Sequence, residues 1–155
     1  MEQTDEYLIL LKQIRRLARA LDVQSRRIDR EVGLTLPQLV VLTALGEMGE
    51  VTSRALSARA DISPPTVVGI LDKLEAKGLI QRYRSRKDRR IVHALITERG
   101  HEALLTAPDP LGARISGGFR ALSASERATV LAGLSRLGEM AAAEEAAEGG
   151  VLPEA

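Results

Sequence analysis

The chain has 155 residues and a formal net charge of +1, so any nucleic-acid surface must be a local patch of charge. It contains no cysteine, which excludes disulfides, thiolate zinc sites and cysteine-based redox sensing. Aromatic residues make up 2% of the chain, too few for binding single-stranded nucleic acid by base stacking. Leucine, alanine, arginine and glutamate dominate and favour a mainly α protein.

Targeting, membrane and catalytic signals are missing from the sequence. The acidic start lacks the basic segment and apolar core of a signal peptide, and no apolar run approaches the roughly 20 residues that cross a bilayer. We therefore expect a cytoplasmic protein with no membrane partner. No carboxylate pair, nucleophile–base set or phosphate-binding glycine loop occurs at usable spacing. We expect no enzyme activity, no catalytic residues, no metal site and no cofactor.

Residues 5–31 have the apolar spacing of one long helix, with Gly33 as its C-cap. The early part, from Leu8 to Leu11, is apolar on more than one face. A small domain has too little surface to cover such a segment, which favours a partner helix from a second copy. The alternative is that this is a core helix of a monomer.

Two short helices are predicted next. Thr35 and Gln38 have the spacing of a capping box, and Gly46 and Gly49 are expected to end the helix that it starts. Thr52 can cap a second helix over residues 53–60. The first of these helices buries a leucine stripe made of Leu39, Leu42 and Leu45.

A helix-turn-helix pattern follows, with a turn over residues 61–63 and a helix that runs to Lys77 before Gly78. Ser63 is a suitable N-cap, and Pro64 fits the first helical position. The buried face predicted by helical spacing consists of Val67, Ile70, Leu71 and Leu74. The opposite side, free to enter a major groove, carries Thr66, Gly69 and Lys73, flanked by Pro65, Val68 and Asp72.

Residues 79–83 and 91–97 then alternate between apolar and polar side chains, which predicts a β-hairpin. Between Arg82 and Arg90 the sequence places six basic side chains and one acid within nine residues. This charge is far more than a turn needs, so we interpret the loop as the wing of a winged helix. The alternative is a solvated turn without a partner.

The C-terminal part is predicted to be helical again. A helix starts at Thr97, the prolines at 108 and 110 interrupt it, and Ser123 with Glu126 forms a capping box for the next helix. Residues 143–155 are expected to form a disordered tail. The predicted fold is mainly α with a small β-hairpin wing: a winged helix-turn-helix domain over 34–97, with helical dimerisation segments over 1–33 and 98–142.

The chain also resembles the MarR family of bacterial transcription regulators from about Leu8 to Met140. The runs that carry the resemblance are LTLPQLVVLTAL (34–45), ISPPTVVGILDKLEAKGLIQR (62–82) and DRRIVHALITERG (88–100). The resemblance implies a homodimer with a recognition helix in a major groove and a wing along the neighbouring minor groove of double-stranded DNA. It also implies a repressor of nearby genes that binds palindromic operators and is released by a small, often aromatic, organic acid.

Carried onto this chain, the resemblance assigns DNA contacts to two groups of residues. The recognition helix contributes Ser63, Pro65, Thr66, Gly69 and Lys73, and the wing contributes Arg84, Arg86, Lys87, Arg89 and Arg90. Arg90 is the arginine expected to enter the minor groove. Asp88 is expected to orient an arginine through a charge-assisted bond. His101 is a candidate for lining a ligand cavity, and His93 is either structural or faces phosphate.

Gly69 departs from the family pattern, because many members carry a long polar or basic side chain at this position. A glycine there reads no base through a side chain and costs about 1 kcal/mol of helix stability relative to alanine. Pro65 and Val68 can instead offer apolar contacts to thymine methyl groups. The alternative is that Gly69 packs closely against another backbone. A second function therefore stays open: an architectural or weakly specific DNA-binding protein without a ligand response.

Overall fold

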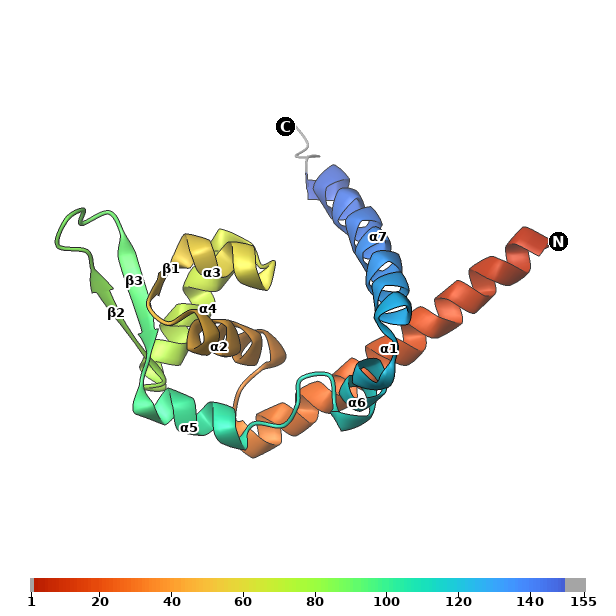
Figure 1. The fold of residues 1–155 in the computed structure, drawn as a ribbon. Helices are drawn as coiled ribbons and strands as arrows, with labels where there is room; N and C mark the ends of the chain where they lie inside the picture. Colours follow the sequence, from red (N-terminus) through yellow and green to blue (C-terminus); the bar gives the residue numbers. More distant parts are fainter. Residues whose placement is uncertain (1, 150–155) are drawn as a thin grey trace. The chain divides into compact units, whose positions relative to one another are not determined.

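The computed structural model describes residues 2–149 and is mainly helical (Figure 1). Its helices are α1 (Glu2–Val32), α2 (Leu36–Met48), α3 (Ser53–Ala60), α4 (Pro64–Ala76), α5 (Glu98–Thr106), α6 (Ala113–Ala121) and α7 (Ala124–Gly149). Its strands are β1 (Val51–Thr52), β2 (Ile80–Arg84) and β3 (Val92–Ile96). The predicted fold class, mainly α with a β-hairpin wing, is confirmed.

The chain divides into two compact units, one up to Gly112 and one from Ala113 onward. The first unit contains the predicted DNA-binding domain together with α1 and α5, and the second contains α6 and α7. The assignment of residues 1–33 and 98–142 to dimerisation stays a prediction. The start of the predicted tail, residues 143–149, is the last part of α7, and residues 150–155 lie outside the described part.

Local capping explains where most helices begin. Thr35 Oγ1 accepts from the Gln38 N–H at 3.4 Å while Gln38 Oε1 accepts from the Thr35 N–H at 3.1 Å, which is the predicted capping box. The same exchange starts α7, where Ser123 N–H donates to Glu126 Oε2 at 2.8 Å. Hydrogen bonds from Ser123 lower the pKa of the Glu126 carboxyl. The capping side chains satisfy N–H groups of the first turn, and both helices begin where the sequence predicts.

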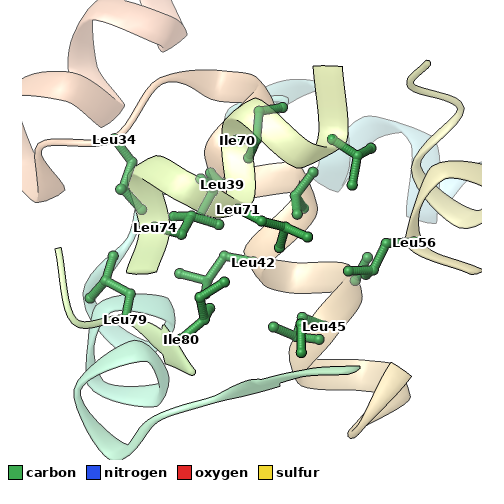
Figure 2. Close-up of a cluster of buried hydrophobic side chains, with 14 of the residues drawn as sticks. Leu34, Leu39, Leu42, Leu45, Leu56, Ile70, Leu71, Leu74, Leu79 and Ile80 are labelled. Carbon is green, nitrogen blue, oxygen red and sulfur yellow. The ribbon is translucent and has the colours of Figure 1, made fainter. Parts of the chain in front are cut away.

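A leucine-rich core holds the first unit together (Figure 2). Side chains from α2, α4 and β2 point toward one another in it, with Leu56 from α3 at its side. The fully buried large side chains are Ile28, Leu34, Leu39, Val41, Leu42, Leu45, Leu56, Val67, Leu71, Leu74 and Ile80. Each buried leucine contributes about 1.5–3 kcal/mol, and this core fixes the orientation of α4.

The sheet contains a strand that the sequence pattern did not indicate. Its order is β1-β3-β2, and both neighbouring pairs are antiparallel. Val51 pairs with Ala94, and Thr52 with His93, so the segment before α3 is attached to the wing. A strand of two residues is too short to produce an alternating pattern.

One glycine was assigned the wrong role. Gly46 lies inside α2, which continues to Met48 and is capped by Gly49. A Cβ at position 46 would lie 2.9 Å from Leu104 Cδ1, so this glycine admits α5 against α2. The constraint is a contact with a distant helix, which local sequence does not display.

The helix α1 packs on the first unit only through its C-terminal half. Ile28 is fully buried, and the Gln24 side chain donates to the Asp109 carbonyl oxygen at 2.5 Å. The apolar residues of the N-terminal half are exposed: Tyr7, Leu8, Ile9, Leu10, Leu11, Ile14 and Leu17. This half is therefore not covered by its own compact unit, which counts against the monomer-core alternative. Among the described residues, no helix is long and apolar enough to cross a membrane.

Candidate nucleic-acid interface

The helix α4 buries one side and exposes the other. The four apolar residues predicted to face the core are the buried ones: Val67, Ile70, Leu71 and Leu74. The predicted DNA-contact residues all lie exposed: Ser63, Pro65, Thr66, Gly69 and Lys73. The structure thus brings these five positions together on one solvent-facing surface, at the N-terminal end and middle of a helix held rigidly by the core.

Ser63 occupies the N-cap position of α4, but its side chain makes no capping hydrogen bond. Its Oγ lies 2.7 Å from Thr66 Oγ1, and the two hydroxyls bond to each other. Prolines at positions 64 and 65 carry no N–H, so the first turn offers few donors to a cap. The expected side-chain cap is therefore replaced by a hydroxyl pair on the exposed side.

The position of Gly69 is open. A Cβ built at this residue meets nothing within 4 Å in the described part of the chain, which counts against the alternative that Gly69 packs against another backbone of its own chain. The helix interior has no internal need for this glycine, since alanine would be favoured there by about 1 kcal/mol. The described part of the chain therefore gives no packing reason for this glycine.

The loop between β2 and β3, residues 85–91, is rich in basic residues and projects beyond α2 to α5 of the first unit (Figure 1). The Ser85 N–H donates to the Ile91 carbonyl oxygen at 2.9 Å. The Ile91 N–H donates to the Asp88 carbonyl oxygen at 3.0 Å. Asp88 Oδ1 accepts from the Arg90 backbone N–H at 2.9 Å. The expectation that Asp88 orients an arginine side chain is thus corrected: its bond is to the main chain, where it shapes the turn.

Five wing cations are exposed and unpaired: Arg84, Arg86, Lys87, Arg89 and Arg90. None of them forms an ion pair within 4 Å in the described part of the chain, although such pairs occur elsewhere, as at Arg59 with Glu47. Because no carboxylate of the described chain occupies them, these side chains are available to bind an external anion. The wing is therefore a local concentration of positive charge on a chain of net charge +1.

Arg82 does not belong to this set, because it ties the wing to α4. Its guanidinium contacts Glu75 Oε2 at 2.6 and 2.9 Å and Asp72 Oδ1 at 2.6 Å. Its backbone N–H also donates to Glu75 Oε1 at 3.1 Å. These hydrogen bonds lower the pKa of the Glu75 carboxyl and raise the pKa of Arg82. The first strand of the wing is thus fixed to the helix beside it.

Replacing Arg82 by methionine should lower the free energy of unfolding by about 1–2 kcal/mol. This is less than the loss expected for a buried ion pair, because solvent screens the partly exposed Glu75. Glu75 has a lowered pKa when folded, so its contribution is present above its ordinary value of 4.5 and is lost as the pH falls below it. Urea unfolding at pH 7 and pH 3 measures this. A difference between variant and wild type that does not shrink at pH 3 would contradict the assignment.

The structure adds a basic residue that the sequence reasoning missed. Arg54, exposed in the first turn of α3, lines a groove of about 430 Å³ together with Arg90, Ile91 and Val92 of the wing. Thr52 caps α3 here, because its Oγ1 accepts a hydrogen bond from the Ala55 N–H at 3.2 Å. The sequence pattern of the wing gives no sign that Arg54 lies beside it, because the pairing of the short strand β1 with β3 brings α3 there. The basic surface therefore extends from the wing to the start of α3.

The two histidines lie on β3 of the wing and on α5. His93 stacks on Tyr83 with ring centroids 5.4 Å apart, and its Nδ1, buried and without a hydrogen bond, is 3.7 Å from Glu50 Oε1. This supports the structural interpretation of His93. Hydrogen bonding to Glu50 raises the pKa of Tyr83. His101 is exposed on α5 and does not line the groove beside Arg54. Among the described residues, no group of histidine or acidic side chains could hold a metal ion.

Comparison with known proteins places this arrangement in a family. The model of the MarR family matches residues 34–92, which run from the start of α2 into the wing. The resemblance of this segment to the MarR family is thus confirmed. The HTH-type transcriptional regulator YkoM of Bacillus subtilis is 26% identical over 137 residues, covering 88% of this chain and 89% of that protein.

Solved structures of MarR-family and related regulators share the fold. Sco3205, a MarR family transcriptional regulator from Streptomyces coelicolor crystallised in complex with DNA, matches with a TM-score of 0.75 at 22% identity, over 88% of this chain and 87% of that chain. The PcaV transcriptional regulator of Streptomyces coelicolor, crystallised with its natural ligand, matches with a TM-score of 0.65 at 25% identity, over 83% and 91%. The relatives are named as transcriptional regulators, and this chain is a regulator, not an enzyme.

Proposed function

We propose that this chain is a sequence-specific transcription regulator that binds palindromic double-stranded DNA as a homodimer and acts as a repressor. The observation that carries the proposal is the exposed side of α4 next to five unpaired wing cations, held in one rigid unit by Arg82. Such a surface can place a helix in a major groove while the wing neutralises phosphates. The relative crystallised with DNA has the same fold, which supports this arrangement.

The experiment that tests the function is a comparison of affinities. A palindrome obtained by selection from random duplexes should bind at least about 10³-fold more tightly than a scrambled duplex at about 0.15 M salt, as specific binders do. A preference below about tenfold would instead support the second candidate, an architectural DNA-binding protein. The observation that favours this candidate is the open position at Gly69, where no side chain is present to read a base.

The basic surface is proposed to include Arg54. Substituting Arg54 by alanine should reduce the slope of log affinity against log salt by about one unit per subunit, because one phosphate contact is lost. Arg90→Ala should do the same. The matched control is Arg59→Ala on the same helix, since Arg59 is already paired with Glu47 at 2.9 Å. Equal slopes for the Arg54 and Arg59 variants would remove Arg54 from the interface.

The dimer is proposed from two helix faces that their own units leave uncovered, one on α1 and one on α7. On α7, Leu131 and Leu134 are 53% and 50% exposed. Glutamate at both positions should convert a dimer into a monomer in sedimentation velocity and weaken operator binding roughly a hundredfold, because two linked half-site contacts become one. Ser135→Glu, also exposed on α7, is the control. A double variant that still sediments as a dimer would refute this role for α7.

A small organic acid is proposed as the releasing ligand. The N-terminal half of α1 carries a groove of about 370 Å³ that combines two leucines with four cations: Leu8, Leu11, Lys12, Arg15, Arg16 and Arg19. Apolar walls with cations suit an aromatic carboxylate. His101 does not line this groove, and its ligand role stays a prediction. Titrating salicylate into the protein–DNA complex tests the proposal, and DNA that stays bound at millimolar salicylate speaks against it.

A further inference from the structure

The exposed side of α4 offers DNA fewer polar groups than its sequence indicates. Asp72 and Glu75 are both occupied by Arg82. Lys77 donates from its Nζ to the Gly33 carbonyl oxygen. The hydroxyls of Ser63 and Thr66 bond to each other at 2.7 Å. Among the long polar side chains of α4, this leaves Lys73 without a partner in the described part of the chain.

The exposed side of α4 also carries an apolar strip. Pro65, Val68 and Gly69 are spaced i, i+3 and i+4, so they lie on one face of the helix. Val68, a large apolar residue, is 45% exposed within the described part of the chain. Gly69, beside it, has open space where a side chain would stand. The strip is therefore accessible to a surface that approaches the backbone closely.

We propose that α4 selects its DNA half-site chiefly through the 5-methyl groups of thymine, contacted by Pro65 and Val68. This inference rests on the proposed function and names the class of sequence that the same surface recognises. The thymine methyl is the apolar group that a base pair presents in the major groove. Of the side chains that read adenine or guanine through paired hydrogen bonds, asparagine, glutamine and arginine do not occur on α4, and lysine occurs there only as Lys73.

The geometry of the helix sets the spacing of the thymines. Pro65 and Val68 are three residues apart, which corresponds to a rise of roughly 4.5 Å along the helix axis. Successive bases on one strand are roughly 3.4 Å apart. The two side chains thus reach methyl groups on neighbouring or next-neighbouring base pairs. Gly69 lets the helix backbone come close enough for both contacts, which a long side chain at this position would prevent.

The test uses the full-length protein and a duplex obtained by selection from random sequences. Each thymine of the half-site is replaced in turn by uracil, which keeps the pairing and the O4 acceptor and removes only the methyl group. At two positions, affinity should fall about fourfold per methyl, the effect of exposing one buried methylene-sized group. Specific binding that is indifferent to every uracil would overturn the inference, and so would a selected half-site without thymine.

Variants identify the side chain that makes the contact. In Val68→Ala the uracil penalty at one position should disappear, whereas in Lys73→Ala, which weakens binding to both duplexes equally, it should persist. A penalty that is unchanged in Val68→Ala would overturn the assignment. Selection with Gly69→Arg should enrich a guanine in the half-site; an unaltered half-site would count against close approach at this position. If selection enriches no sequence at all, the proposed function fails, and that outcome is distinct from specific binding without a methyl effect.

Discussion

Replacing all five unpaired wing cations by alanine should lower the affinity for a selected operator by roughly a thousandfold or more at about 0.15 M salt. The residues are Arg84, Arg86, Lys87, Arg89 and Arg90, none of which has an ionic partner in the described part of the chain. Each phosphate contact adds about 0.9 to the salt slope, so losing five lowers it by about 4.5 per bound subunit. Fluorescence anisotropy titrations over a salt series measure both quantities.

A loss of two paired cations elsewhere on the chain provides the control. Arg26 and Arg27 are exposed on α1 and paired with Asp22 and Glu31 at 2.6 and 2.7 Å. Substituting both by alanine changes net charge without touching the wing, and the salt slope should stay close to that of the wild type. If the wing variant retained its slope, or if the control lost as much affinity, the binding charge would lie outside the wing.

The second large effect concerns stability, at Gly100 in the first turn of α5. A Cβ there would lie 2.2 Å from the Leu79 carbonyl oxygen and 2.6 Å from Ile96 Cγ1. The Leu79 oxygen cannot move away freely, because it accepts the Thr97 N–H at 3.0 Å. Gly100→Ala should therefore lower the free energy of unfolding by about 3 kcal/mol, the upper end of ordinary overpacking. Urea denaturation at fixed protein concentration measures this.

Gly69→Ala is the matched control, because it makes the same chemical change in an open position. Nothing lies within 4 Å of a Cβ at residue 69, so alanine should raise the free energy of unfolding by up to about 1 kcal/mol through its helix propensity. Opposite signs for the two substitutions are expected. A Gly100→Ala variant as stable as the wild type would mean that α5 does not approach Leu79 as closely as described.

Features that depend on local chemistry could be predicted from the sequence. The Thr35–Gln38 and Ser123–Glu126 capping boxes can be recognised in the sequence, because a threonine or serine is followed three residues later by a glutamine or glutamate. The structure contains both. The buried stripe of α4 follows from helical periodicity alone. The exposure of its opposite side then follows, because a helix that buries one stripe in a small core leaves the other to solvent.

Features that depend on contacts between distant segments could not be predicted. Arg82 looks like one more wing cation until the fold places it between Asp72 and Glu75. Arg54 joins the basic surface only because β1 pairs with β3. Gly69 could be interpreted as a packing residue or as an open position, and only the space around it decides between them. In each case the deciding neighbour is a tertiary contact that local sequence does not encode.

The central claim is that the wing provides affinity for any duplex while α4 provides preference for one sequence. The most direct test is a salt series in which wild-type protein binds the selected duplex and a scrambled duplex. Because both complexes use the wing cations, the two lines of log affinity against log salt should both be steep, and they should stay about 10³-fold apart throughout. Lines that lie within tenfold of each other, or a scrambled duplex bound without salt dependence, would contradict this division of roles.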